Sequence, residues 1–202
     1  MSLRRHSTRC VVLCALAVLP AAAQGPDSQR LVESGHIEME GQSIPYLVRR
    51  LPLNAFPDLP NAVVEQLNQR QCLIPQSYEA HHPENVVHGS LERAGSSDWA
   101  VLCSSEGKTS LLVFFGSAPG KPAVLATEPE TKRLQRHDSS GVLGFNWAIE
   151  PASPQKVHEA QSGMEKRPLR PDHDALADIT LDRTTIYRFF KKGSWTVVDT
   201  SD

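Results

Sequence analysis

The sequence predicts a β-rich α+β domain built mainly from antiparallel strands, with one short helix packed on the sheet. Three observations predict this fold class. Short runs of β-branched and aromatic residues recur from Val86 to the C-terminus, helical periodicity is scarce after residue 72, and prolines punctuate the connections. Because these connections are too short for helical crossovers, we expect neighbouring strands to pair antiparallel.

The N-terminal segment has the three parts of a secretory signal peptide. Arg4, Arg5 and Arg9 form a basic region, residues 10–19 form an apolar core, and small residues follow up to Ala23. The alternative to a cleaved signal peptide is an uncleaved membrane anchor. The apolar run argues against this alternative, because it falls short of the roughly 20 residues that a membrane span requires. We therefore expect residues 1–23 to be removed and residues 24–202 to form one secreted or periplasmic domain without a membrane span.

The charge balance argues against two classes of partner. Removing residues 1–23 takes away three arginines and no acidic residue, so the formal net charge falls from −2 to −5. Nucleic acids and anionic membranes attract clustered lysines and arginines, and a chain with a net negative charge has no excess of basic residues for such a cluster. We expect neither as a partner.

Residues 58–71 are predicted to form the helix. Asp58 is the expected N-cap, with Pro60 in the first turn. Apolar residues then recur at helical spacing, namely Leu59, Val63, Val64 and Leu67. This helix would deliver Cys72 at its end.

Strands are predicted over short segments separated by turn residues. The predicted segments lie near residues 44–48, 86–91, 98–104, 109–115, 122–127, 143–149, 178–182, 184–190 and 194–199.

The stretch Gly107-Lys108-Thr109 invites a nucleotide-binding interpretation, which the spacing excludes. A phosphate loop would need a glycine where Leu102 stands, and the residues after Thr109 are strand formers rather than a helix start. Glu106 and Gly107 are expected instead to form the two-residue turn of a hairpin.

This hairpin turn predicts a register. It places Cys103 opposite Ser110, Val101 opposite Leu112, and Trp99 opposite Phe114. Both faces of the pair are apolar, which is typical of strands in the middle of a covered sheet. The hairpin is therefore interpreted as core, with the helix over the Trp99 face.

The C-terminus predicts a second hairpin over residues 184–199, with a turn of two or four residues within 191–194. Tyr187, Phe189 and Val198 are expected on one face, and Ile186, Phe190, Trp195 and Val197 on the other. We interpret Trp195 as a packing residue, the alternative being a ligand-stacking role.

The mature chain retains two cysteines, Cys72 and Cys103, and an exported pair of this kind predicts a disulfide. A catalytic thiol and two free buried cysteines are the alternatives. Cys103 lies among apolar residues of a predicted strand, where burial would raise the pKa of a thiol rather than activate it.

Sequence motifs for catalysis are missing. The chain contains neither Gly-x-Ser-x-Gly nor His-Glu-x-x-His. His81, His82 and His88, accompanied by Glu84, are candidates for a zinc site, but the alternative is a solvated loop. We assign no catalytic residue and no cofactor-binding residue.

Asp172, Asp174 and Asp178 form the most suggestive polar cluster. Alternating carboxylates in a loop can converge on calcium, a hard cation that takes six to eight oxygen ligands. Three carboxylates need further oxygens to complete that shell, so the alternative is an ordinary acidic turn before a strand. Calcium is therefore a candidate cofactor.

Two resemblances add expectations. Residues 89–102 resemble the calcium-loop-and-strand unit of FG-GAP or VCBS-type repeats, with Gly95 and Asp98 at the positions of the family's glycine and last aspartate, and with Ala94 departing from the pattern. Asp172 and Asp174 match the first two positions of the same pattern, and Leu176 departs from the third. This resemblance implies a degenerate metal loop.

The order of "CLIPQS", "DWAVLCS", "PDHDALAD" and a closing aromatic hairpin is similar to a group of uncharacterised secreted bacterial proteins. That resemblance implies a shared fold and export, and it brings no functional residues.

Two function classes follow from the sequence. The first is a non-catalytic extracytoplasmic binding or structural domain, whose partner would be a protein or a glycan. The alternative is a secreted hydrolase whose site is assembled from scattered His and carboxylate residues. A structure discriminates between them by showing whether such side chains meet in one concave pocket.

Overall fold

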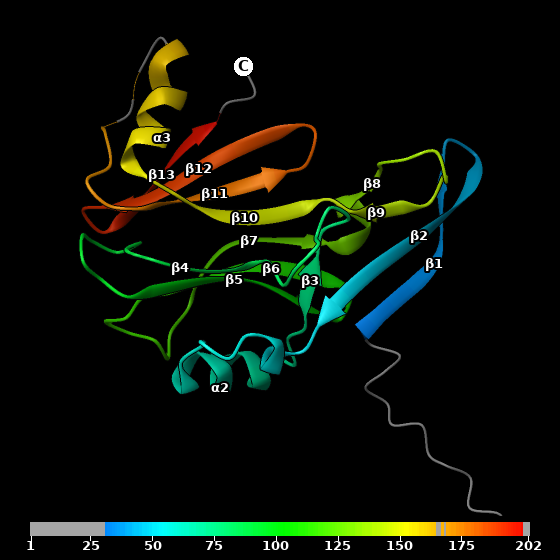
Figure 1. Ribbon diagram of the computed structural model, residues 1–202, viewed down its shortest axis with the longest axis horizontal. Helices are drawn as coiled ribbons and strands as arrows, with labels where there is room; N and C mark the ends of the chain where they lie inside the picture. The colour runs from blue at the N-terminus through cyan, green and yellow to red at the C-terminus, as the bar shows by residue number, and fades with distance from the viewer. Residues whose placement is uncertain (1–30, 165–166, 168, 200–202) are drawn as a thin grey trace, which may run out of the picture.

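The computed structural model describes residues 31–164, 167 and 169–199, so the expected signal peptide lies outside the described residues. The described chain folds into three mainly antiparallel sheets with two short α-helices, as Figure 1 shows. The predicted β-rich α+β fold is confirmed.

The N-terminal sheet is formed by β1 (Val32–Met39), β2 (Gln42–Leu51), β9 (Leu143–Phe145), β8 (Leu134–Arg136) and β3 (Ile74–Gln76). β2 changes its neighbour along its length. Tyr46 and Leu47 pair with β9 in parallel, whereas residues 49–51 pair with β3 in antiparallel. The sheet is therefore split at the point where β2 passes from one neighbour to the other.

The middle sheet contains β4 (Val86–Gly89), β5 (Asp98–Ser105), β6 (Lys108–Phe114) and β7 (Ala123–Pro129) in that order. The predicted register of the β5–β6 hairpin is confirmed for all three residue pairs. Glu106 and Gly107 both have positive φ, which is the geometry of a type I′ turn.

The C-terminal sheet contains β10 (Trp147–Ala152), β11 (Ala175–Thr180), β12 (Thr184–Lys191) and β13 (Ser194–Asp199). Its last hairpin has a two-residue turn at Lys192 and Gly193, and the predicted division of its aromatic residues between two faces is confirmed. The predicted strand near 143–149 is corrected: β9 and β10 flank Asn146 and belong to different sheets.

The predicted helix is confirmed as α2 (Asn61–Gln69), but its expected start is wrong. Pro60 occupies the N-cap position and no side chain caps the helix, so Asp58 has no capping role. A second helix, α3 (Pro154–Ala160), was not predicted; Ser153 caps it by accepting a hydrogen bond from the Lys156 N–H. Three short 3₁₀ segments complete the helical elements: η1 (Leu53–Ala55), η2 (Glu130–Arg133) and η3 (Gln161–Gly163).

The elements pack in layers. α3 covers the outer face of the C-terminal sheet, that sheet packs on the middle sheet, and α2 covers the opposite face of the middle sheet (Figure 1). The central core takes buried side chains from all three sheets, including Leu102, Trp147 and Leu143. Among the described residues, neither α-helix is a candidate membrane span.

The predicted disulfide is confirmed between Cys72 and Cys103, whose Cα atoms lie 5.1 Å apart. Both cysteines are buried in the layer between α2 and the middle sheet, beside Leu67 and Leu112. The chain-entropy model gives such a bridge roughly 3 to 4 kcal/mol. The bridge fixes α2 over the Trp99 face, as expected.

Candidate functional site

The three aspartates predicted as calcium ligands have separate partners. Asp178 is buried and accepts hydrogen bonds from the Trp147 indole at 2.6 Å and from Arg188 at 2.9 Å. Asp172 is exposed beside the His173 imidazole, and Asp174 accepts from the Ser90 N–H at 3.0 Å.

No group of three or more His, Cys, Asp or Glu side chains within the described residues could hold a metal ion. The calcium hypothesis for Asp172, Asp174 and Asp178 thus gains no support from the geometry and stays a prediction.

The segment that resembles a calcium loop is organised around Asp98. This carboxylate is fully buried and accepts from the Glu92 N–H at 2.7 Å, from the Gly116 N–H at 2.7 Å and from the Ser96 hydroxyl. All three partners are donors, so the carboxylate ties its loop to the segment after β6 rather than presenting oxygens to a cation.

The three candidate zinc histidines have different surroundings. His81 and His82 are exposed in the loop before β4. His88 lies on β4, where its ring stacks on Trp99 with centroids 4.6 Å apart and its Nε2 lies 2.8 Å from the Ser97 hydroxyl.

A pocket of about 320 Å³ opens on the outer face of the N-terminal sheet, where β2 passes from β9 to β3. We call it the Tyr78 pocket. Leu47 and Arg49 reach it from β2, Tyr78 from the segment after β3, and His137 from the segment after β8. These residues are far apart in the sequence and meet because the split sheet brings their strands together.

Tyr78 and His137 form a stacked pair with ring centroids 4.4 Å apart and an interplanar angle of 8°. The Tyr78 backbone N–H donates to the Phe145 carbonyl at 2.9 Å, and its hydroxyl donates to Asp182 at 2.6 Å and accepts from Gln135 at 3.3 Å. Because it is held at both ends, the tyrosine ring keeps a fixed position in the pocket.

Gly144 forms the floor beneath this pair. A Cβ atom at this position would lie 2.6 Å from the Tyr78 Cβ and 2.9 Å from the His137 Cδ2. Both distances are shorter than carbon–carbon contact allows. Glycine at position 144 therefore allows the Tyr78 and His137 rings to pack directly against the backbone of β9.

Burial raises the pKa of the Tyr78 hydroxyl, and the hydrogen bond to the Asp182 carboxylate raises it further. The hydroxyl consequently stays protonated and remains a donor to Asp182 across the physiological range. It is a structural anchor of the pocket rather than a group that exchanges its proton.

Hydrogen-bond donors and acceptors, together with apolar side chains, line the rest of the pocket. The Arg49 guanidinium donates to the Ala80 carbonyl at 2.7 Å, and its other N–H groups have no partner among the described residues. Asp138 supplies a carboxylate, and Ser77 also lines the cavity. The apolar part comes from Leu47, Val142, Leu143 and Phe145.

A His and a carboxylate therefore meet in one concave pocket, as the hydrolase alternative requires, but their contact is loose. His137 Nδ1 lies 3.7 Å from Asp138 Oδ2, which is longer than a hydrogen bond. Asp138 is engaged by Ser140, whose N–H donates at 2.9 Å and whose hydroxyl donates at 2.6 Å. Hydrogen bonding from Ser140 lowers the pKa of Asp138.

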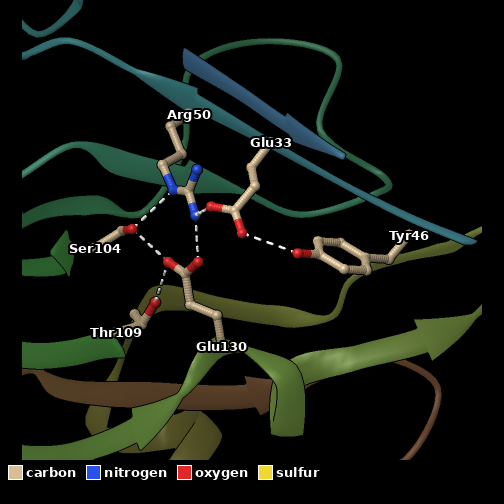
Figure 2. Close-up of polar contacts among 6 residues, drawn as sticks. All are labelled: Glu33, Tyr46, Arg50, Ser104, Thr109 and Glu130. Atoms are coloured by element: carbon tan, nitrogen blue, oxygen red, sulfur yellow. Dashed lines mark hydrogen bonds and ion pairs between the residues drawn. The ribbon is translucent and has the colours of Figure 1, made fainter. Parts of the chain in front are cut away.

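A buried polar network on the inner side of β2 holds the strand in place. Figure 2 shows Arg50 between two carboxylates: its Nη2 donates to Glu33 at 2.8 Å and also to Glu130. Arg50 Nε donates to the Ser104 hydroxyl at 2.8 Å, and Thr109 donates to Glu130 at 3.1 Å. The network joins β1 and β2 to the middle sheet, so Arg49 on the opposite side of β2 is held over the pocket.

The charges in this network stabilise one another. Burial alone would lower the pKa of Arg50, but hydrogen bonds to Glu130 and Glu33 outweigh burial and raise the pKa above its usual value. Burial likewise opposes ionisation of Glu33, yet the donors Arg50 and Tyr46 lower the pKa of its carboxyl. The folded structure therefore favours the charged forms of both Arg50 and Glu33 more than water does.

Comparison of the chain with protein-family models, curated proteins and solved structures yields no match. The resemblances of residues 89–102 and of the longer motif order stay predictions.

Sequence reasoning did not find the residues of the Tyr78 pocket. Tyr78 lies in a segment that reads as a loop, and His137 follows an unpredicted three-residue strand. The one local signal was Gly144 within a predicted strand, because an isolated glycine there often marks a close approach of other groups.

Proposed function

We propose that this protein is an extracytoplasmic, non-catalytic binding domain whose ligand occupies the Tyr78 pocket. The observation that carries the proposal is the stacked Tyr78–His137 pair, which is locked over Gly144 before any ligand arrives. A site that is ordered in advance loses little conformational entropy on binding, and this favours recognition.

The lining favours a hydroxyl-rich ligand such as a sugar unit of a glycan. A sugar presents donors and acceptors around its ring and apolar C–H groups on its faces. Arg49 offers unpaired N–H donors, Asp138 offers Oδ2 as an acceptor while its Oδ1 accepts from Ser140, and the Tyr78–His137 pair and Leu47 offer apolar surface. A small number of convergent polar groups on an apolar lining is the usual composition of such sites.

Binding is favoured over hydrolysis because the potential catalytic groups are not arranged for proton transfer. A His general base needs an orienting partner and a nucleophile within hydrogen-bond distance. Here Asp138 is committed to Ser140, and no described hydroxyl or thiol donates to His137. Export is supported by the signal-peptide pattern together with the Cys72–Cys103 bridge.

The test is a glycan array probed with the mature protein and with Arg49→Ala and His137→Ala. Wild type is expected to retain a sugar that both variants lose, whereas Arg93→Ala, which removes an exposed arginine elsewhere, should bind normally. Absence of any retained glycan contradicts the proposal. Cleavage of a retained glycan that His137→Ala abolishes would favour the hydrolase alternative.

A further inference from the structure

A second candidate site lies on a different layer, beside α2 on the face of the middle sheet that faces this helix. We propose that this groove, which we call the Trp99 groove, binds an extended proline-containing peptide with a neighbouring lysine or arginine. Its floor is Val86, His88 and Trp99, and residues 55–59 form its wall. This inference does not depend on the Tyr78 pocket.

The groove exists because α2 covers only part of the sheet. On β4 and β5, Val86 pairs with Val101 and His88 pairs with Trp99. Val101 is fully buried beneath the helical layer, whereas Trp99 at the open end of the hairpin is only half-buried. The wall stands beside this uncovered end and leaves a cavity of about 480 Å³. Trp99 therefore packs against the core with one part of its side chain and leaves another part exposed to the groove.

Both sides of the groove are held in place. The His88 ring stacks on Trp99 at a centroid distance of 4.6 Å, and its Nε2 contacts the Ser97 hydroxyl at 2.8 Å. On the wall, Leu59 is buried in the core beneath α2, which the disulfide fixes to β5. A ligand would therefore meet a preformed surface.

Two polar groups at the groove are unused. Within the part of the chain that the structure describes, neither the Trp99 indole N–H nor the Asp58 carboxylate has a hydrogen-bond or ion-pair partner. An indole N–H is a donor only, and Asp58 is the one carboxylate among the described lining residues, which include no lysine or arginine. The Asp58 carboxylate is exposed and Trp99 is half-buried, so a ligand that brings one acceptor and one cation can pair with both groups.

An extended proline-containing peptide satisfies these requirements. In the polyproline II conformation the backbone carbonyls make no internal hydrogen bonds, so one can accept from the Trp99 N–H. Proline rings pack well in aromatic-lined grooves, here against Trp99 and Phe56. A neighbouring basic side chain complements Asp58. A sugar fits less well, because most of its hydroxyls would lose water without gaining partners on this largely apolar lining.

The test is calorimetric titration with the blocked peptide acetyl-Pro-Pro-Pro-Pro-Arg-amide. Trp99→Phe keeps the aromatic packing and removes the N–H, and is expected to weaken binding about tenfold. Asp58→Asn should weaken binding of this peptide, and should leave unchanged the affinity of the analogue with norleucine in place of arginine. His137→Ala, in the Tyr78 pocket, serves as the matched control and should bind normally.

Three outcomes would overturn the inference. The first is the absence of binding to folded wild type at millimolar peptide. The second is binding that Trp99→Phe and Asp58→Asn leave unchanged, because the peptide would then lie elsewhere. The third is glycan binding that depends on Trp99 while the peptide is not bound. Glycan binding lost in Arg49→Ala concerns the other pocket, so the two proposals fail separately.

Discussion

At the scale of single residues, Gly144 is the position on which the Tyr78 pocket depends most directly. Gly144→Ala would bring a Cβ to 2.6 Å from the Tyr78 Cβ, an atom too close to the backbone to move freely. We expect the free energy of unfolding to fall by about 1 to 3 kcal/mol, as overpacked sites do. Urea denaturation measures this loss. Gly120→Ala is the control, because a Cβ there meets nothing within 4 Å, and an equal loss in both variants would contradict the prediction.

Residue-scale predictions from the sequence succeeded where few partners were available. Cys72 and Cys103 are the two cysteines outside the predicted signal peptide, so their pairing followed from counting. Asp172, Asp174 and Asp178 are close in the chain, but burial and tertiary donors give each a different partner. Although the three aspartates are close in the sequence, their carboxylates do not converge on one site in the fold.

At the scale of elements, three of the described hairpins share one turn, whereas the β11–β12 hairpin has a three-residue loop without glycine. Glu40–Gly41, Glu106–Gly107 and Lys192–Gly193 each place a non-glycine residue and then a glycine at positive φ. The first central residue of such a type I′ turn is most favourable as asparagine. Within the described residues the Glu106 side chain has no hydrogen-bond or ion-pair partner that would be lost on substitution.

Glu106→Asn is therefore expected to stabilise the fold by about 0.5 kcal/mol, since asparagine tolerates the left-handed conformation better than glutamate. Chemical denaturation at neutral pH measures the change. Glu106→Val is the matched comparison and should destabilise the protein, because a β-branched residue is strained at positive φ. A lower stability of the asparagine variant would show that the turn does not set this preference.

Elements were predictable where their own residues specified them. The β5–β6 register followed from its turn and from two apolar faces. β1 was missed because it is an edge strand whose exposed side chains, such as Ser34 and His36, form no apolar run. β3 and β8 are three residues long and owe their pairing to neighbours. α3 presents one buried residue, Val157, so it carries almost no helical periodicity.

At the scale of the whole molecule, Glu33 links acid stability to Arg50, the residue whose Nε donates to Ser104 of the middle sheet. Burial opposes its ionisation, but Arg50 and Tyr46 lower its pKa below the usual 4.5. A lowered pKa contributes stability above pH 4.5, and this contribution is lost as the pH falls through the folded-state pKa. Glu33→Gln should thus lose less stability than wild type on acidification below pH 4.5, measured by urea midpoints.

Glu38→Gln is the control for this pH effect, because Glu38 lies on the same strand and has no ion-pair partner among the described residues. Its acid profile should follow that of wild type. Identical profiles for wild type and Glu33→Gln would show that the contact with Arg50 and Tyr46 does not couple to folding.

The Arg50–Glu130 pair is a charged contact between β2 and η2, which directly follows β7 of the middle sheet, and both side chains are buried. Removing one partner leaves a buried charge without its counterion, which costs about 3 to 5 kcal/mol. We expect Arg50→Met and Glu130→Met each to lower the free energy of unfolding by about this amount. The double variant should lose less than the sum, because no stranded charge remains between these two positions.

A double-mutant cycle by urea denaturation gives the coupling energy directly. Since Glu33, Ser104 and Thr109 also belong to the network, the double variant is expected to stay below wild type in stability. A coupling energy near zero would mean that the ion pair between Arg50 and Glu130 adds nothing to the stability of the fold. In that case the charged network would not fix β2, and the position of Arg49 over the Tyr78 pocket would need another cause.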